Sequence, residues 1–327
     1  MQTIQSNMQG DSPLVSFVVT AYNLPGDMLS ECIGSIVALS LGRCEREIIV
    51  VDDGSDAFAI NDLADFADDI VYLRQTNQGL SCARNNGLKL ATGRYIQFVD
   101  GDDYLLQAQY EHCLDLVRYH DADIVCFNST GKKETEVPYK YSPPVSGSAF
   151  LHNNNLHASA CGYIFRSDIL QNLRFTPGIL HEDEEFTPLL FLKAERVIAT
   201  DAKAYFYRKR DNSIMHTSND KQHTQKRLDD TERIILHLQK KSYRLAEAER
   251  VALNRRIAQL TMDYLYNTMV LTRSADRVEQ TVQRLHDKGL FPLPNKKYTR
   301  KYQLFAKAVN SKIGRRLLMM TLPKPKG

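Results

Sequence analysis

The feature that most constrains the fold is a regular alternation of short apolar runs and amphipathic segments over the first hundred residues. Each apolar run is rich in β-branched residues and short enough to be one buried strand. The segments between the runs carry apolar residues at helical spacing. This βαβαβαβ order predicts an α/β fold with a mostly parallel, doubly wound sheet and right-handed crossovers. The expected strands are residues 15–20, 47–51, 70–73 and 95–99, and the expected helices between them are residues 30–40, 58–66 and 81–91.

The later part of the chain changes character. Residues 128–155 are polar and interrupted by prolines, which predicts loops. Strand character returns at residues 162–165 and 197–207, and beyond residue 218 the apolar residues fall on helical stripes. We therefore expect a sheet-containing domain over residues 1–218 and a helical region over residues 219–327.

Charge is distributed unevenly along the sequence. The formal net charge of the 327 residues is only +3, but residues 288–327 hold eleven Lys or Arg and no Asp or Glu. The preceding residues hold 31 basic and 39 acidic side chains, a balance of −8. A clustered basic tail indicates an anionic partner or surface.

The sequence also indicates a cellular compartment. Its apolar runs are far shorter than the roughly 20 residues that a membrane-spanning helix needs, and residues 1–11 lack the pattern of a secretory signal. None of the six cysteines forms a CxxC pair, which is typical of a reduced protein. We therefore expect a cytoplasmic protein with no transmembrane helix.

Polar side chains cluster where three of the expected strands end. Tyr22 and Asn23 follow the first strand, and Asp52 and Asp53 follow the second. An acidic turn at residues 100–103 follows the fourth. Because ligands of open parallel sheets bind beyond the carboxyl ends of the strands, these clusters are expected to line one crevice.

The acidic turn is a candidate cation site. Its three carboxylates, Asp100, Asp102 and Asp103, lie within four residues around Gly101. Mg²⁺ and Mn²⁺ prefer oxygen ligands and keep positions open for substrate phosphates. Taken alone, the motif is explained equally well as a solvated acidic turn.

Three residues are candidates for nucleotide binding. The Asp53 carboxylate could accept hydrogen bonds from a nucleobase imide or a ribose hydroxyl, and the Tyr22 ring could stack on a base. The Arg84 guanidinium, in the first turn of an expected helix, suits either a phosphate or a structural brace to one of the Asp residues. Taken singly, turn formation is the simpler explanation of Asp53, and packing is the simpler explanation of Tyr22.

Two later segments add candidates. Glu182 and Asp183 lie in an acidic stretch before an apolar run, where a carboxylate could act as a general base or simply stabilise a helix N-terminus. Residues 207–216 form a basic loop with one histidine, His216. A lone histidine is more often a surface or packing residue than a ligand.

Taken in order, five motifs resemble glycosyltransferase family 2. They are residues 15–23, 51–55, 77–88 and 95–103 and the Glu-Asp-x-x-Phe pattern at 182–186, and the resemblance covers about residues 13–216. It implies the Rossmann-like GT-A fold, a nucleotide-sugar donor, usually a UDP-sugar, and Mn²⁺ or Mg²⁺ bound through a DXD motif.

Carried over residue by residue, the resemblance implies a role for each donor-side candidate. Tyr22 would stack on the base, Asp53 would hydrogen-bond the uracil, and Arg84 would lie close by. Asp100 would meet the ribose, and Asp102 would coordinate the metal. The other residues expected to bind the nucleotide are Ala21, Asn23 and Gly101, and His216 is a further expected metal ligand.

The resemblance also implies a mechanism. Asp183 would deprotonate an acceptor hydroxyl as it attacks the anomeric carbon in a single inverting displacement, with Glu182 as the second candidate base. The metal and basic groups such as Arg84 or Arg208 would stabilise the leaving diphosphate. The expected activity is that of a hexosyl- or N-acetylhexosaminyltransferase of polysaccharide, capsule or glycolipid assembly, with a glycan or lipid-linked glycan as acceptor.

One departure from the family concerns the acceptor side. Many members carry a tryptophan before the Glu-Asp-x-x-Phe pattern, whereas this chain has no Trp and has residues 159–166 there. Tyr163 or Phe165 could supply the missing aromatic face, and core packing explains both equally well. The identity of the acceptor therefore cannot be carried over from the family.

Two other classes of protein are alternatives. A sugar nucleotidyltransferase would have a Gly-rich basic loop after the first strand, where residues 24–27 are acidic and short. A nucleotide- or glycan-binding module would bind metal without catalysis. For residues 296–327 the alternatives are contact with the anionic inner membrane surface, as a peripheral protein, and packing on the catalytic domain. No nucleic-acid partner is needed, and an oligomer is compatible with the sequence.

Overall fold

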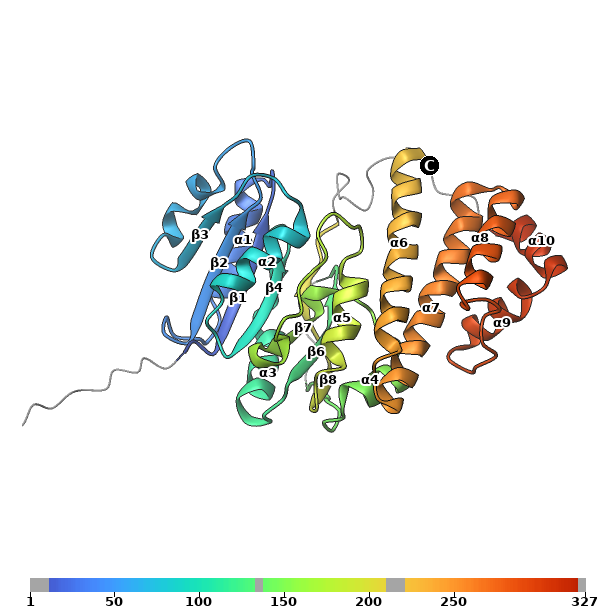
Figure 1. Cartoon of the computed structure of the whole chain (residues 1–327). Coiled ribbons are helices and arrows are strands. Elements are labelled where there is room, and N and C mark those ends of the chain that lie inside the picture. Colours follow the sequence, from blue (N-terminus) through green and yellow to red (C-terminus); the bar gives the residue numbers. More distant parts are fainter. Residues whose placement is uncertain (1–11, 133–137, 210–220, 323–327) are drawn as a thin grey trace, which may run out of the picture. The chain divides into compact units, whose positions relative to one another are not determined.

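The computed structural model describes residues 12–132, 138–209 and 221–322, and the chain divides into two compact units (Figure 1). The first, which we call the sheet unit, comprises Met1–Ser146, Ser159–Gly178 and Lys193–Lys209. The second, the helical unit, comprises Gly147–Ala158, Ile179–Leu192 and Arg210–Gly327.

The first half of the sheet consists of the four expected strands. β1 (Val15–Ala21), β2 (Arg46–Asp52), β3 (Ile70–Arg74) and β4 (Tyr95–Asp100) pair in parallel. β1 lies between β2 and β4 and is buried along its whole length, as a central parallel strand covered on both faces should be. The prediction of an α/β fold with a mostly parallel sheet is confirmed for this half.

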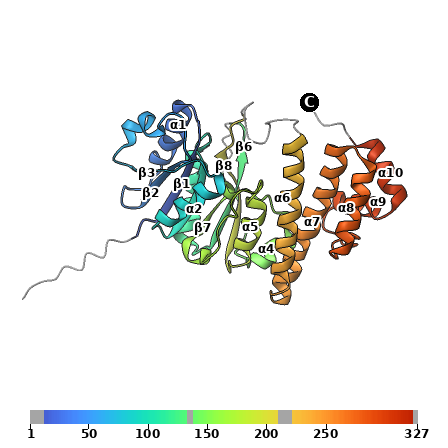
Figure 2. The same ribbon diagram turned by 45° about the horizontal axis from the view of Figure 1, so that its top comes forward.

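The second half of the sheet is mixed. β7 (Tyr163–Arg166) pairs antiparallel with both β4 and β6 (Ile124–Thr130). β8 (Val197–Phe206) pairs parallel with β6 and antiparallel with the short β5 (Tyr104–Leu105), and Figure 2 shows β6 beside β8. The order of all eight strands is β3-β2-β1-β4-β7-β6-β8-β5.

Helices connect the parallel strands as the alternation predicts. α1 (Gly26–Val37) joins β1 to β2, and α2 (Leu80–Leu90) packs against both strands. Gly87 allows this close approach, because a Cβ atom there would lie 2.2 Å from Cγ1 of Val18.

One expected α-helix has a different form. The segment predicted at residues 58–66 is a 3₁₀ helix, η1 (Ala59–Phe66), with a non-helical backbone at Leu63. Only Ala59 and Leu63 of this segment are buried. Such a small apolar face gives little packing energy to stabilise a regular α-helix.

Besides the short β5 and two 3₁₀ turns, two elements of the sheet unit have no counterpart in the sequence prediction. They are α3 (Gln107–Tyr119), which packs against β8 and β6, and β6 itself. The buried face of α3 includes Tyr110, Cys113, Leu114 and Val117 at helical spacing, so the sequence held an amphipathic pattern there that the prediction overlooked. Short 3₁₀ turns, η2 (Ala160–Gly162) and η3 (Ser167–Leu170), flank β7.

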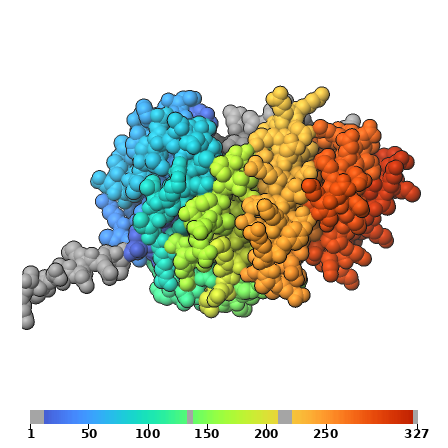
Figure 3. Space-filling view, in the orientation of Figure 1, coloured from blue at the N-terminus to red at the C-terminus, as the bar shows by residue number. Residues whose placement is uncertain are grey.

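The helical unit has its own hydrophobic core. Fully buried Leu238, Leu253 and Leu265 lie at its centre. They come from α6 (Lys221–Ser242) and α7 (Glu247–Thr272), and α8 (Ala275–Asp287) packs against α7. Figure 3 shows these C-terminal helices, coloured yellow to red, as a closely packed surface.

Most of the basic tail is folded into this unit. α9 (Arg300–Val309) buries Tyr302, Phe305 and Val309 and contacts both α7 and α10 (Lys312–Thr321). α9 is therefore packed within the helical unit, whereas the sequence analysis offered packing on the catalytic domain as one of its two alternatives for residues 296–327.

Two segments that precede residue 218 belong to the helical unit. They hold α4 (Gly147–Asn153), inside the tract predicted to be loops, and α5 (Asp183–Phe191). α4 packs against α7, where Arg255 donates hydrogen bonds to the Leu151 and His152 carbonyls. The boundary predicted at residue 218 itself lies outside the described residues. None of the described helices is long and apolar enough to cross a membrane.

Candidate active site

The loop after β1 is tied to the loop after β2. The Asp53 N–H donates to the Ala21 carbonyl at 2.9 Å, and the Asn23 N–H donates to the Ser55 hydroxyl at 2.9 Å. Asn23 adopts a left-handed backbone, with φ of 47°, and its side-chain oxygen accepts from the Asp56 N–H at 2.8 Å. Between these fixed points the Tyr22 side chain is 49% exposed. The ring is therefore presented at the carboxyl end of β1 and is not buried in the core.

Asp53 anchors the loop that leads into α2. Its buried carboxylate accepts from the Gln75 side-chain amide at 2.7 Å, from the Gln78 N–H at 2.9 Å and from the Gly79 N–H at 2.8 Å. A carboxylate offers about four lone-pair positions, so three donors leave room for one more. The geometry thus combines a structural role with the capacity to accept a hydrogen bond from a ligand.

The neighbouring Asp52 has a different role. It is fully buried and accepts hydrogen bonds from the Tyr72 hydroxyl at 2.6 Å, the Ser55 N–H at 2.9 Å and the Arg74 guanidinium at 3.2 Å. Burial by itself raises the pKa of Asp52, but the hydrogen bonds from Tyr72 and Ser55 outweigh it and bring the pKa below its usual range. Asp52 is therefore an ionised internal brace.

A pocket of about 540 Å³ opens beside these loops. It is lined by Gly54 and by a run of residues at the end of β3, namely Arg74, Gln75, Thr76 and Asn77. Gly54 has φ of +80°, and a Cβ atom there would lie 2.6 Å from the Asn77 nitrogen, so the close approach of the two loops requires glycine. The sequence analysis included Asn77 in the motif at residues 77–88 but missed Arg74, Gln75 and Thr76, although the strand-end rule applied to β3 would have found them.

Arg84 forms the brace that was one of its two expected roles. It is 3% exposed, donates to the Asp100 carboxylate at 2.9 Å, and lies 5.8 Å and 5.4 Å from the ring centres of Phe98 and Phe175. The ion pair orients the Asp100 carboxylate at the carboxyl end of β4.

The acidic turn after β4 is tightly built. The Gly101 N–H donates to the Thr20 carbonyl at 2.9 Å, and a Cβ atom at Gly101 would clash with Leu24 and Thr20. Asp103 is 1% exposed and accepts from the Arg208 N–H at 2.8 Å. Burial and the neighbouring Asp100 raise the pKa of Asp103 to about 8, so this carboxyl is largely protonated at neutral pH.

Arg208 contributes a positive charge beside the acidic turn. Its side chain donates to the Asp102 carbonyl at 2.9 Å and to the Glu31 carboxylate at 2.5 Å. Asp102 is the partly exposed aspartate next to the buried Asp103.

Within the described residues, no group of three or more His, Cys, Asp and Glu side chains could hold a metal ion by itself. His216, the expected further ligand, lies outside the described residues. Mg²⁺ and Mn²⁺ are commonly held by one or two carboxylates plus substrate phosphates. The donor set at this turn, a partly exposed Asp102 beside the braced Asp100, fits that kind of site.

The candidate bases belong to the helical unit. Glu182 is buried immediately before α5, and its carbonyl accepts from the Phe186 N–H, whereas Asp183 is the first helical residue. Of the two carboxylates that follow, Glu184 is held by an ion pair with Arg256, and Glu185 is held by a hydrogen bond with the His237 ring. The first turn of α5 is therefore fixed from α7 and α6, an arrangement that the sequence reasoning did not foresee.

The chain before α5 is also anchored to α6. The Leu180 N–H donates to the Asp230 carboxylate at 2.9 Å, and Asp230 is paired with Lys226 at 2.7 Å. His181, which follows, has a left-handed backbone with φ of 60°. Burial and the nearby Arg227 lower the pKa of His181, so it is neutral at physiological pH.

The two candidate aromatic residues on the acceptor side are core residues. Tyr163 and Phe165 are 2% and 0% exposed. Phe165 packs on Phe98 with ring centres 5.9 Å apart. Core packing, the second of the two explanations, accounts for both.

Comparison with known proteins gives a consistent result. The sequence pattern of the family "Glycosyl transferase family 2" matches residues 16–174. A relative in Bacillus subtilis, "Uncharacterized glycosyltransferase EpsJ", is 33% identical over 223 residues, which is 62% of this chain and 63% of the relative. The Staphylococcus aureus protein "Poly(ribitol-phosphate) beta-N-acetylglucosaminyltransferase TarS" is 26% identical over 200 residues, 59% of this chain and 35% of the relative. The chain thus spans less than two thirds of the length of these relatives.

Solved structures show the same fold. The S. aureus TarS fragment 1–349 in complex with UDP-GlcNAc has a TM-score of 0.62 at 19% identity, covering 90% of each chain. The mannosyltransferase PcManGT from Pyrobaculum calidifontis, in complex with GDP-Man and Mn²⁺, has a TM-score of 0.57 at 14% identity, covering 95% of this chain and 88% of the other. The expected GT-A fold is confirmed.

Proposed function

We propose that this chain, which belongs to glycosyltransferase family 2, transfers a sugar from a nucleotide-sugar, a UDP-sugar, to an acceptor hydroxyl with inversion of configuration and with the help of a divalent cation. The observation that carries the proposal is the arrangement at the carboxyl ends of the parallel strands. A pocket lies beside the Asp53 loop, and the braced acidic turn ends β4. Such a strand-end crevice is where α/β sheets bind nucleotides.

On the donor side, we assign base recognition to Tyr22 and Asp53. The exposed Tyr22 ring supplies a stacking face, and the remaining lone-pair position of the Asp53 carboxylate accepts the imide N–H of uracil. We assign to Asp100, whose carboxylate accepts a hydrogen bond from Arg84, the contact with a ribose hydroxyl. Ala21, Asn23 and Gly101 shape the two loops through backbone contacts.

Asp102 would hold the cation, Mn²⁺ or Mg²⁺, together with the donor diphosphate. When bound, the ion supplies positive charge that stabilises the leaving diphosphate. Arg208, fixed against the same turn, adds a second cationic group there. For His216, the role of a further metal ligand is proposed from the family resemblance alone.

Asp183 is the proposed base, and Glu182 is the second candidate. The Asp183 carboxylate takes the proton of the acceptor hydroxyl while that oxygen bonds to the anomeric carbon. The bond from the anomeric carbon to the diphosphate breaks, and the diphosphate keeps the electron pair. The ion pair of Glu184 with Arg256 and the hydrogen bond of Glu185 with His237 fix the first turn of α5, so the direction of the base is set before the acceptor binds.

The acceptor is proposed from the relatives. TarS is named a poly(ribitol-phosphate) N-acetylglucosaminyltransferase, and GgaB of B. subtilis is named a minor teichoic acid biosynthesis protein. We infer a hexosyl or N-acetylhexosaminyl transfer to a glycan or lipid-linked glycan in cell-envelope polysaccharide assembly. We place this reaction in the cytoplasm at the inner face of the membrane.

A donor screen tests the proposal. The protein is incubated with Mn²⁺ and, separately, UDP-glucose, UDP-galactose and their N-acetyl forms, and released UDP is measured. Release from one donor, lost in Asp183→Asn, is expected. Exchange of pyrophosphate with UTP would instead indicate a nucleotidyltransferase, and tight UDP binding without turnover of any donor would indicate a binding module.

A further inference from the structure

The outward side of α10 is unusual for a terminal helix. Ile313, Leu317 and Met320 are 74%, 57% and 80% exposed. Lys312 and Arg316 are exposed beside them. Because successive helical residues are rotated by about 100°, these five side chains fall within an arc of about 140°. We call this surface the α10 face; it is an apolar stripe with a basic edge.

The opposite side of α10 is firmly attached to the helical unit. Arg315 is 7% exposed and donates to both Glu279 carboxylate oxygens, at 2.8 Å and 2.7 Å, and to the Val309 carbonyl at 2.9 Å. Leu318 and Met319 pack against the core of the unit. The α10 face is therefore the outer surface of a fixed helix whose core side is already covered.

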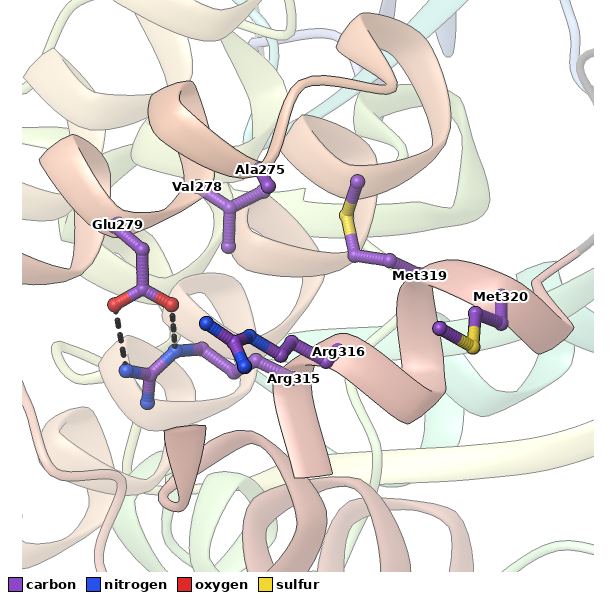
Figure 4. Close-up of a pocket in the computed structure, with 7 residues that line it drawn as sticks. All are labelled: Ala275, Val278, Glu279, Arg315, Arg316, Met319 and Met320. Carbon is purple, nitrogen blue, oxygen red and sulfur yellow. Dashed lines mark hydrogen bonds and ion pairs between the residues drawn. The ribbon is translucent and has the colours of Figure 1, made fainter. Parts of the chain in front are cut away.

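A small pocket adjoins the α10 face. It has a volume of about 210 Å³ and is lined largely by apolar side chains of α8 and α10, including Val278 and Met319. Figure 4 shows Arg315 paired with Glu279 and Arg316 extending alongside it. Two members of the α10 face, Arg316 and Met320, are part of the lining. Apolar surface and exposed basic side chains thus meet at one place.

The charge of the α10 face indicates which kind of partner it would bind. Lys312 and Arg316 form no hydrogen bond or ion pair with any residue that the structure describes, whereas Arg315 is neutralised by Glu279. Residues 288–327 contain eleven basic and no acidic residues. A second copy of the chain would present the same basic edge and would be repelled. A nucleic acid would satisfy the charge but not the apolar stripe.

We propose that the α10 face docks on the surface of an anionic phospholipid bilayer. Ile313, Leu317 and Met320 enter the boundary between headgroups and acyl chains, and Lys312 and Arg316 contact lipid phosphates, as in interfacial amphipathic helices. The inference rests on the proposed function only for the choice of the inner leaflet, where a lipid-linked acceptor would be found.

The test is co-sedimentation of the full-length protein with vesicles in the absence of any nucleotide. Vesicles of phosphatidylcholine alone are compared with vesicles that also contain phosphatidylglycerol, at low and at high salt. We expect binding to the anionic vesicles only, weakened by salt. The double variant Lys312→Glu/Arg316→Glu should bind at least about tenfold more weakly, and Ile313→Ser/Leu317→Ser/Met320→Ser should lose binding to a similar extent.

Val251→Asp, at an exposed apolar position of α7, is the matched control and should bind like the wild type. Thermal unfolding confirms that each variant is folded, and the charge variant keeps the test valid if the serine variant is unstable. The proposal would be overturned if the wild-type protein did not bind anionic vesicles, or if both variants bound them as tightly as the wild type. A wild-type dimer that the serine variant dissociates would instead make the face an interface between copies and would also overturn it. UDP release measured without vesicles reports separately on the proposed function.

Discussion

The two units hold their candidate functional residues by different means. In the sheet unit, Asp53 and Asp103 accept N–H groups from loops that follow neighbouring strands, so each carboxylate is positioned by the sheet itself. In the helical unit, the turn at Asp183 is positioned by side chains from two long helices, Arg256 and His237. The comparison teaches that the proposed donor site depends on local strand-end turns, whereas the proposed base depends on contacts distant in sequence.

The largest effect is expected at the base. Asp183→Asn keeps the shape of the side chain but cannot accept the acceptor proton, and loss of an essential general base typically costs about 10²–10⁴-fold in rate. Turnover is measured by UDP release. Glu182→Gln is the matched variant and should retain more activity than Asp183→Asn. If Glu182→Gln is the more damaging change, the base assignment moves to Glu182.

The next largest effect, on UDP affinity, is expected at the loop before α2 that Asp53 anchors. Asp53→Asn places an amide N–H group toward the Gln78 and Gly79 N–H donors, which disrupts the loop before α2. A hydrogen bond to a charged group contributes about 1.5–3 kcal/mol, so UDP binding should weaken about 10–100-fold. Isothermal titration calorimetry measures it. Asp68→Asn, at an exposed aspartate of the same unit, is the control, and equal affinity of both variants would remove Asp53 from the donor site.

A smaller effect, on kcat, tests whether the helical unit orients the proposed base. Arg256→Gln removes the partner of Glu184 and should lower kcat about tenfold, with UDP affinity unchanged, because it acts on the direction of Asp183. Arg256→Lys, which keeps the charge, should recover part of the activity. Arg250→Gln, exposed on the same helix, should behave like the wild type. A fall in UDP affinity that matches the fall in kcat would show that Arg256 supports the whole fold and not the base.

The smallest effect concerns the stability of the α8–α10 contact. The hydrogen bond from Arg315 lowers the pKa of Glu279 from its ordinary value of 4.5. A lowered pKa in the folded state means that the ion pair stabilises the protein fully above about pH 4.5 and that this stabilisation is lost as the pH falls through the lowered pKa. Glu279→Gln should therefore lower the Tm at neutral pH. For this partly exposed ion pair, the loss in free energy of unfolding should be at most about 1 kcal/mol. The difference in Tm should vanish in acid, and a difference that persists there would assign the effect to packing.

The same division between the units explains what could be predicted from the sequence. β1, β2 and β4 are visible as apolar runs because most of their residues are buried, and the strand-end rule then places Tyr22, Asp53 and Asp100. The donor-side candidates follow from local pattern. Residues at the end of β3, such as Gln75, were within reach of the same rule but were overlooked.

The apolar stripe of α3 was likewise present in the sequence and overlooked. Other features could not be read from local pattern: α4, for example, is a short helix stabilised by Arg255 from more than a hundred positions away. The contacts of Glu184 with Arg256 and of Glu185 with His237 join residues from three separate helices, so no spacing in the sequence predicts them. Burial of Asp103, which changes its protonation, likewise depends on Arg208 returning to the turn after β4.

Calorimetry of UDP binding to Asp183→Asn and Asp53→Asn side by side tests the central claim most directly. The claim is that the sheet unit binds the donor and the helical unit supplies the base. It predicts that Asp183→Asn binds UDP as tightly as the wild type while turning over no donor, and that Asp53→Asn loses affinity. If Asp183→Asn loses as much UDP affinity as Asp53→Asn, the separation of the two roles is wrong.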